Sequence, residues 1–122
     1  MATILIIDDD AAFLHSMKKT AETLGHVALT AINTAEAARL LHHKPDIALI
    51  DLVMPKVDGL EAMNVLRVAL PGMRIVAVTG ARYSDFDPLA VALELGADGA
   101  LKKPITAEML SSEIARLEAR SR

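Results

Sequence analysis

The sequence predicts an α/β fold in which five βα units form a doubly wound parallel sheet with helices on both faces, a three-layer sandwich. Short β-branched runs alternate with helical patterns, which is typical of a parallel sheet with crossover helices. Most of these runs contain a continuous apolar stretch of three or four residues, as strands covered on both faces do. The predicted strands are Thr3–Ile7, Val27–Ala31, Ile47–Asp51, Arg74–Thr79 and Gly99–Lys102.

Residues that start and stop helices lie between the predicted strands. Asp10 is the expected N-cap of the first helix, and Gly25 ends that helix. The starts of the other four helices are marked by the capping-box pairs Asn33 with Glu36 and Asp58 with Glu61, by Asp87-Pro88, and by Thr106. Asp58-Gly59 is also expected to form a tight turn into the third helix.

Composition limits the classes of function. A chain of 122 residues with 52% hydrophobic residues has enough apolar material for one core, so we expect a single domain over residues 1–122. The net charge of -3 argues against direct binding of nucleic acid or anionic lipid. The chain contains no cysteine, which excludes disulfides and thiolate catalysis. With no signal-like start and no apolar run of membrane-spanning length, a cytoplasmic protein is expected.

The acids of the chain gather at the ends of predicted strands. Short right-handed crossovers leave few sheet orders, and the order 2-1-3-4-5 would place the first and third strands side by side. Ligands of such sheets bind beyond the carboxyl ends of the strands, at the point where the strand order reverses. In this chain Asp8-Asp9-Asp10 and Asp51 follow or end those two strands. We therefore expect the functional site at this edge.

Carboxylates on neighbouring strands need a cation between them, because adjacent strands lie only ~4.8 Å apart. Mg²⁺ fits this setting, since it binds one or two carboxylates and shares its other positions with water and phosphate oxygens. Asp51 is then placed to attack a phosphoryl group. Thr79 and Lys103, at the ends of the fourth and fifth strands, would supply a hydroxyl donor and a positive charge.

Over essentially its whole length the chain resembles the receiver domains of two-component response regulators, which share a flavodoxin-like fold. The segments that carry the resemblance are Ile6–Asp10, Ala48–Pro55 with Asp58-Gly59, Val78-Thr79 and Lys103-Pro104. Each segment alone is a weak signal, whereas their combination is highly specific. The sheet order 2-1-3-4-5 is known for a chemotaxis member of this family, so the resemblance itself supplies part of the support for that order.

The resemblance implies a role for each matching residue. Asp51 would accept the phosphoryl group, and Thr79 and Lys103 would contact its oxygens. The Mg²⁺ ligands would be the carboxylates of Asp8, Asp9 and Asp51 and the backbone carbonyl of Val53. The Lys103-Pro104 bond would be cis. Two neighbouring residues compete with these assignments: Asp10 is more often a helix cap than a ligand, and Lys102 stands beside Lys103.

The resemblance also implies a signalling switch rather than an enzyme, although the domain would take part in its own phosphotransfer and autodephosphorylation. The phosphoryl donor would be a sensor histidine kinase or a histidine phosphotransfer protein. Phosphorylation would change the face formed by the fourth helix, fifth strand and fifth helix, which would contact a downstream protein target. The sequence does not decide whether the protein forms a homodimer. It also does not decide between a stand-alone regulator and a part of a longer protein.

One position departs from the family pattern. Receiver domains usually carry an aromatic residue three positions before the site lysine, and here that position is Ala100. The predicted loop from Thr79 to Pro88 contains Tyr83 and Phe86, two of the three aromatic residues of the chain. We hypothesise that this loop carries the conformational signal in place of the missing ring.

Two other functions fit parts of the pattern. The first is a phosphatase of the haloacid-dehalogenase type, because Asp8-Asp9-Asp10 contains its Asp-x-Asp spacing and Asp8 would then be the nucleophile. That family needs a further acidic pair on a later strand, and it leaves Asp51 without a role. The second is a protein-binding module on the same fold that works without phosphorylation, which the complete acidic pocket disfavours.

Overall fold

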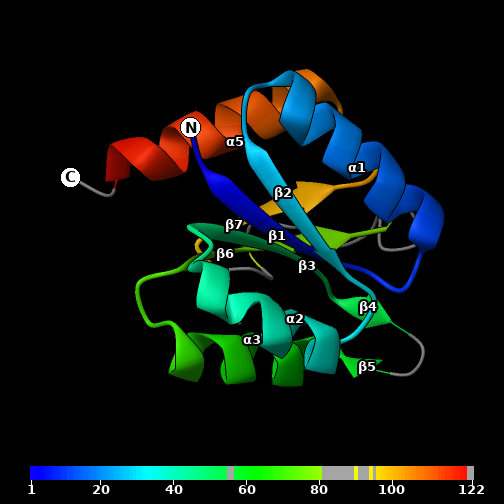
Figure 1. Ribbon diagram of the computed structural model, residues 1–122, viewed down its shortest axis with the longest axis vertical. Coiled ribbons are helices and arrows are strands. Elements are labelled where there is room, and N and C mark those ends of the chain that lie inside the picture. Colours follow the sequence, from blue (N-terminus) through cyan, green and yellow to red (C-terminus); the bar gives the residue numbers. More distant parts are fainter. Residues whose placement is uncertain (55–56, 81–89, 91–93, 95, 121–122) are drawn as a thin grey trace.

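Five parallel strands form the central sheet of the computed structural model, which describes residues 1–54, 57–80, 90, 94 and 96–120. The strands lie in the order β2-β1-β3-β6-β7 (Figure 1). Their bounds are β1 Thr3–Ile7, β2 Val27–Ala31, β3 Ile47–Asp51, β6 Arg74–Thr79 and β7 Gly99–Lys102. Counted along the chain, this is the predicted order 2-1-3-4-5, and all five strands begin and end at the predicted residues.

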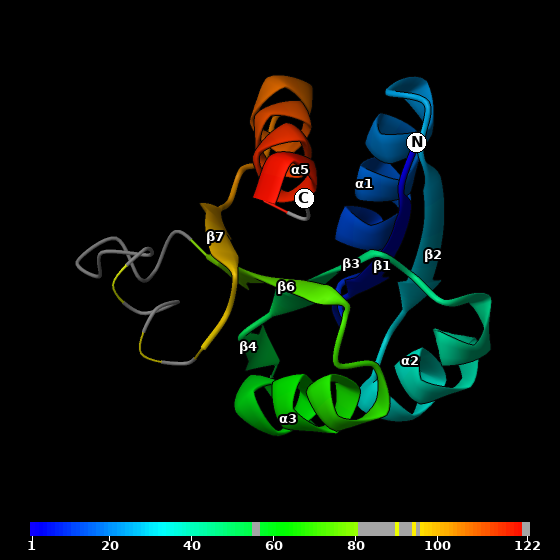
Figure 2. The ribbon, with the colours of Figure 1, turned by 90° about the vertical axis from the view of Figure 1, so that its left-hand side faces the viewer.

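Helices cover both faces of the sheet. Helices α1 (Ala11–Thr23) and α5 (Ala107–Arg120) lie side by side on one face, while α2 (Thr34–Leu40) and α3 (Gly59–Ala69) lie on the other (Figure 2). A short 3-10 helix, η1 (Leu41–His43), follows α2. The predicted three-layer α/β sandwich is therefore confirmed. In the described parts of the chain, no helix combines the length and the apolar character needed to cross a membrane.

The alternation of side chains along each strand divides the core into two clusters. Under α1 and α5, strand residues such as Ile4, Ile6 and Leu49 pack with Leu14, Met17, Leu110, Ile114 and Leu117. Under α2 and α3, Leu5, Ile7 and Ile50 pack with Ala37, Met63 and Leu66. Because successive strand residues point to opposite faces, strands with consecutive apolar residues supply both clusters.

The caps that were predicted for three helices are present. Asp10 accepts hydrogen bonds from the backbone N–H of Ala12 and Phe13 at 3.0 and 3.3 Å, so it is the N-cap of α1. Gly25 follows the helix with a φ of 89°, a conformation that glycine adopts without strain. Asn33 Oδ1 accepts from Glu36 N at 2.8 Å, and Thr106 Oγ1 accepts from Met109 N at 3.1 Å.

A two-stranded hairpin between β3 and α3 was not predicted. Strand β4 (Val53–Met54) pairs antiparallel with β5 (Val57–Asp58), and α3 begins at Gly59 directly after β5. The predicted tight turn at Asp58-Gly59 is therefore wrong, because Asp58 pairs with Val53 instead of turning. Asp87-Pro88, Tyr83 and Phe86 lie outside the described residues, so the predictions made for them stay predictions.

Candidate functional site

The register of the sheet brings the acids of the first and third strands together. Ile7 of β1 pairs with Ile50 of β3, so Asp8 and Asp51 follow at the same level of two adjacent strands. Asp8 is held there by its backbone N–H, which donates to the carbonyl of Ala31 at 3.1 Å. Carboxylate oxygens of Asp8, Asp9 and Asp51 all lie within 4.8 Å of one another. The predicted acidic cluster at this edge therefore exists.

Burial makes it costly to keep the carboxylates of this cluster charged. Asp8 is 0% exposed and Asp51 is 7% exposed, while Asp9 faces solvent. Like charges this close disfavour one another in a medium of low polarity, so the cluster needs positive charge. The oxygen-only donor set and the carboxylate spacing fit a hard divalent cation such as Mg²⁺. Val53, whose carbonyl was predicted as a further ligand, lies in β4 just beyond Asp51.

Lys103 supplies one positive charge to the cluster. Its Nζ lies 2.7 Å from Asp8 Oδ2 and 3.2 Å from Asp51 Oδ2, and its side chain is 22% exposed. Burial alone would lower the pKa of Lys103, but the hydrogen bond to Asp8 and the charges of Asp51 and Asp8 more than offset this. The pKa of Lys103 is consequently raised above 10.5, and the side chain is an ammonium at neutral pH.

The backbone around Lys103 is fixed by its neighbours. Its N–H donates to the carbonyl of Thr79 at 2.8 Å, and the Lys103-Pro104 bond is cis, as predicted. Thr79 ends β6 and is 7% exposed. It belongs to the last residue pair between β6 and β7, in which its partner is Lys102. Of the two neighbouring lysines, Lys103 is thus the one that reaches the acids.

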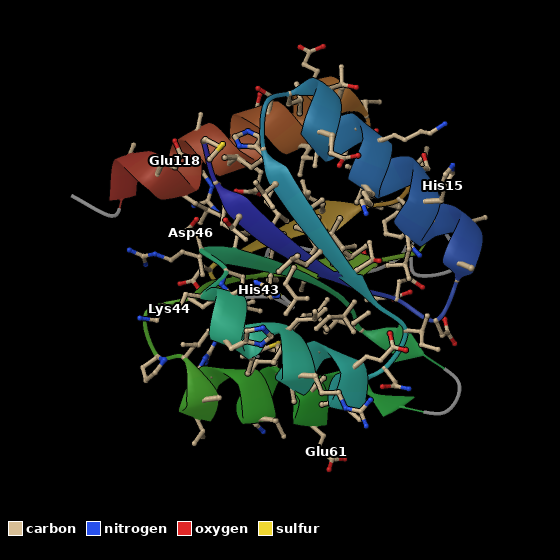
Figure 3. The ribbon with its side chains drawn as sticks, in the orientation of Figure 1. His15, His43, Lys44, Asp46, Glu61 and Glu118 are labelled. Atoms are coloured by element: carbon tan, nitrogen blue, oxygen red, sulfur yellow. The ribbon has the colours of Figure 1, made fainter. Side chains whose placement is uncertain are left out.

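Asp10 shapes the site without belonging to the acidic cluster. Its backbone N–H donates to Asp8 Oδ1 at 2.9 Å, and its side chain caps α1. Both carboxylate oxygens of Asp8 are therefore engaged, one by the loop and one by Lys103. The expectation that Asp10 is a cap is confirmed. His15, which follows Asp10 by five residues, is exposed on α1 (Figure 3).

One neighbour of Lys103 was missed by reasoning from the sequence. The ring of Phe13, in the first turn of α1, has its centroid 4.1 Å from Lys103 Nζ. Phe13 had counted only as one of the apolar positions of the first helix. Its place three residues after the cap Asp10 was the available signal, since that spacing returns the helix to the side of its cap. Ala100 is partly buried against the α2 and α3 side of the core.

Comparison with known proteins gives the family. The sequence profile of the response regulator receiver domain matches residues 4–115. The chain belongs to the response regulator receiver domain family. Phosphorylation on an aspartate is typical of this family, and the match decides against a phosphatase of the haloacid-dehalogenase type. The predicted resemblance is confirmed, as is the function as a receiver domain of two-component signalling.

Individual relatives agree with this assignment. The transcriptional regulatory protein PrrA of Mycobacterium tuberculosis is 36% identical over 117 residues, which cover 95% of this chain and 48% of that protein. A cyclic di-GMP phosphodiesterase of Thermotoga maritima is 30% identical over 112 residues, covering 92% of this chain and 30% of that protein. The chain thus spans about half or less of the length of these curated relatives. A receiver domain from Clostridium thermocellum superimposes with a TM-score of 0.84 at 31% identity, covering 98% of this chain and 96% of that one.

Proposed function

We propose that this receiver domain accepts a phosphoryl group on Asp51 in a reaction that requires Mg²⁺. The observation that carries the proposal is the position of the Asp51 carboxylate. It belongs to the cluster with Asp8 and Asp9, and it also lies 3.2 Å from the ammonium of Lys103. A carboxylate in this position has both a metal-binding surface and a cation for the incoming phosphoryl oxygens. Asp8 also meets both conditions, but Asp8 is 0% exposed and Asp51 is 7% exposed, so Asp51 is the carboxylate that a phosphoryl donor can reach.

In the proposed step, an oxygen of the Asp51 carboxylate forms a bond to phosphorus while the bond from phosphorus to the donor nitrogen breaks. The nitrogen belongs to a phosphohistidine, and the departing imidazole takes up a proton. When bound to Asp8, Asp9, Asp51 and the Val53 carbonyl, Mg²⁺ would neutralise the charge that otherwise repels the phosphoryl group. The product is an acyl phosphate on Asp51.

Two residues at neighbouring strand ends would stabilise the transferred group. Lys103 already lies beside Asp51 and would donate from Nζ to a phosphoryl oxygen. Thr79, buried at the end of the adjacent strand β6, would donate its hydroxyl hydrogen to another. Both act as preorganised donors, which stabilise developing charge without a large rearrangement.

The partners follow from this chemistry. The donor would be a sensor histidine kinase or a histidine phosphotransfer protein, and the output would be an altered contact with a downstream protein. A chain without cysteine, receiving its phosphoryl group from such donors, would act in the cytoplasm as a single receiver domain over residues 1–122. Because position 100 is alanine and not the usual aromatic residue, we keep the hypothesis that Tyr83 and Phe86 transmit the signal instead.

The decisive experiment is incubation with acetyl phosphate and Mg²⁺, followed by intact-mass analysis. Wild type is expected to gain the mass of one phosphoryl group, and Asp51→Asn is expected to gain none. Asp46→Asn is the matched control, because Asp46 lies just before the same strand at its opposite end and binds Thr3 N at 2.8 Å. Uptake by Asp51→Asn would overturn the proposal. Asp8→Asn is expected to reduce uptake because Asp8 is a proposed metal ligand, so only uptake that is kept by Asp51→Asn and lost in Asp8→Asn would identify Asp8 as the nucleophile.

A further inference from the structure

Lys103 is held from two directions by one short segment of the chain. At the start of this segment Asp8 accepts from Lys103 Nζ at 2.7 Å, and at its end the ring centroid of Phe13 lies 4.1 Å from the same nitrogen. A lysine ammonium within about 6 Å of an aromatic centroid is attracted by the negative face of the ring. The ammonium therefore has an acidic partner and an aromatic partner, separated by a single helix start.

The position of Phe13 is tied to the acids by hydrogen bonds. Asp8 Oδ1 accepts from Asp10 N at 2.9 Å, and Asp10 Oδ1 accepts from Phe13 N at 3.3 Å. Two hydrogen bonds thus connect the buried carboxylate to the backbone of Phe13. Because α1 begins at Ala11, Phe13 lies in its first turn, and the segment Asp8–Asp10 fixes where that turn starts.

The ring is not simply core filling. Phe13 is partly buried against the α1 and α5 side of the core, and it borders an apolar hollow of about 320 Å³. The hollow is lined by Phe13, Ser16, Met17, Lys103, Pro104 and Ile105. Around the ammonium, the ring takes space that water would otherwise occupy, which strengthens the remaining electrostatic contacts of the lysine.

We propose that Phe13 is a positioning residue for phosphoryl transfer, because its ring holds the Lys103 ammonium at the edge of the sheet where Asp51 reacts. A free lysine side chain samples many rotamers, and ordering it during the reaction costs entropy. The ring and Asp8 restrict that freedom before the donor arrives. This inference rests on the proposed phosphorylation of Asp51 and adds a residue to that site.

The test compares three variants with wild type in the acetyl phosphate reaction. There the Asp51 oxygen bonds to phosphorus as the bond from phosphorus to the acetate oxygen breaks, and acetate leaves. Phe13→Leu keeps apolar bulk without a ring and is expected to slow phosphorylation roughly threefold to tenfold, the size of one cation–π contact. Phe13→Tyr restores the ring and is expected to restore the rate. Leu24→Ala, which removes packing from the same core cluster at the other end of α1, is the control and should leave the rate unchanged.

A second measurement reports the contact itself. In the wild-type protein, NMR signals of the Lys103 ε-methylene protons should be displaced by the ring current of Phe13. They should return to ordinary lysine values in Phe13→Leu and be displaced again in Phe13→Tyr. An ordinary wild-type signal, or a Phe13→Leu rate equal to that of wild type, would overturn the inference while leaving the proposed function intact. An equal loss of rate in Leu24→Ala would also overturn it, and a wild type that takes up no phosphoryl group would overturn both proposals.

Discussion

The ammonium of Lys103 lies closer to Asp8 than to Asp51, at 2.7 Å against 3.2 Å. Asp8 is the more deeply buried of the two acids, with its side chain 1% exposed. A buried carboxylate that loses its counter-charge is costly, so Asp8 depends on this lysine as long as no metal ion is bound. The lysine assigned to the phosphoryl group therefore also stabilises the resting fold.

Replacing Lys103 should expose that dependence. We expect Lys103→Met to lower the free energy of unfolding in EDTA by ~2 kcal/mol, less than a fully buried ion pair would lose, because Asp8 keeps its bond from Asp10 N. The same substitution should tighten Mg²⁺ binding, since it removes a positive charge from the cluster. Urea unfolding and calorimetric titration with Mg²⁺ measure the two effects.

Lys102→Met is the matched control for this variant. Lys102 is the chain neighbour of Lys103, and it pairs with Thr79 in the sheet. In the described ion pairs, Asp8 and Asp51 bind Lys103 and not Lys102. We expect its unfolding free energy to stay within about 0.5 kcal/mol of wild type. Equal losses from the two substitutions would mean that general charge, rather than the contact with Asp8, stabilises the fold.

The raised pKa of Lys103 predicts an alkaline limit to this contribution. A group whose pKa is higher in the folded state stabilises the fold fully below its unfolded pKa, here 10.5, and the benefit is lost as pH rises through the folded pKa. Between pH 9 and 12, wild type should therefore lose stability more steeply than Lys103→Met, with the difference appearing above about pH 10.5. Parallel curves for the two proteins would contradict the prediction.

The strands could be predicted residue by residue because their signal is local. A run such as Thr3–Ile7 is rich in apolar and β-branched residues, and three acids follow it on the chain. The hairpin of β4 and β5 could not be predicted, since strands of two residues contain too few positions to show an alternating pattern. Helix caps were readable for the same reason as the strands, because Asp10 and Asn33 act on residues two or three positions away.

The acidic cluster was predictable only once a sheet order had been assumed. Asp8 and Asp51 are distant in sequence, and their proximity follows from the pairing of β1 with β3. The contact of Phe13 with Lys103 lies beyond such reasoning, since it depends on where a helix packs on the sheet and on the rotamers of two long side chains. Strand pairing can be inferred from chain order, whereas side-chain contacts between layers require a three-dimensional structure.

The core gives a prediction that is independent of the site. Leu110 of α5 is 0% exposed within the cluster under α1 and α5. Leu110→Ala should lower the free energy of unfolding by ~2–5 kcal/mol through lost burial and a residual cavity. Val68→Ala on α3 is the control, because Val68 is 81% exposed and its truncation should change stability by less than about 0.5 kcal/mol. Urea unfolding of both variants tests this.

Asp9 and Asp10, neighbours in the chain, should separate metal binding from helix capping. Asp9 belongs to the acidic cluster, so Asp9→Ala should weaken Mg²⁺ binding about tenfold or more in calorimetric titration. Asp10 accepts from Ala12 N and Phe13 N, so Asp10→Ala should lower the unfolding free energy by ~1 kcal/mol and change the Mg²⁺ affinity less than about twofold. Asp10→Ser, which keeps a capping oxygen, should recover most of that stability. If Asp10→Ala weakened Mg²⁺ binding as strongly as Asp9→Ala, Asp10 would have to be counted among the metal ligands, and its cap would be a secondary role.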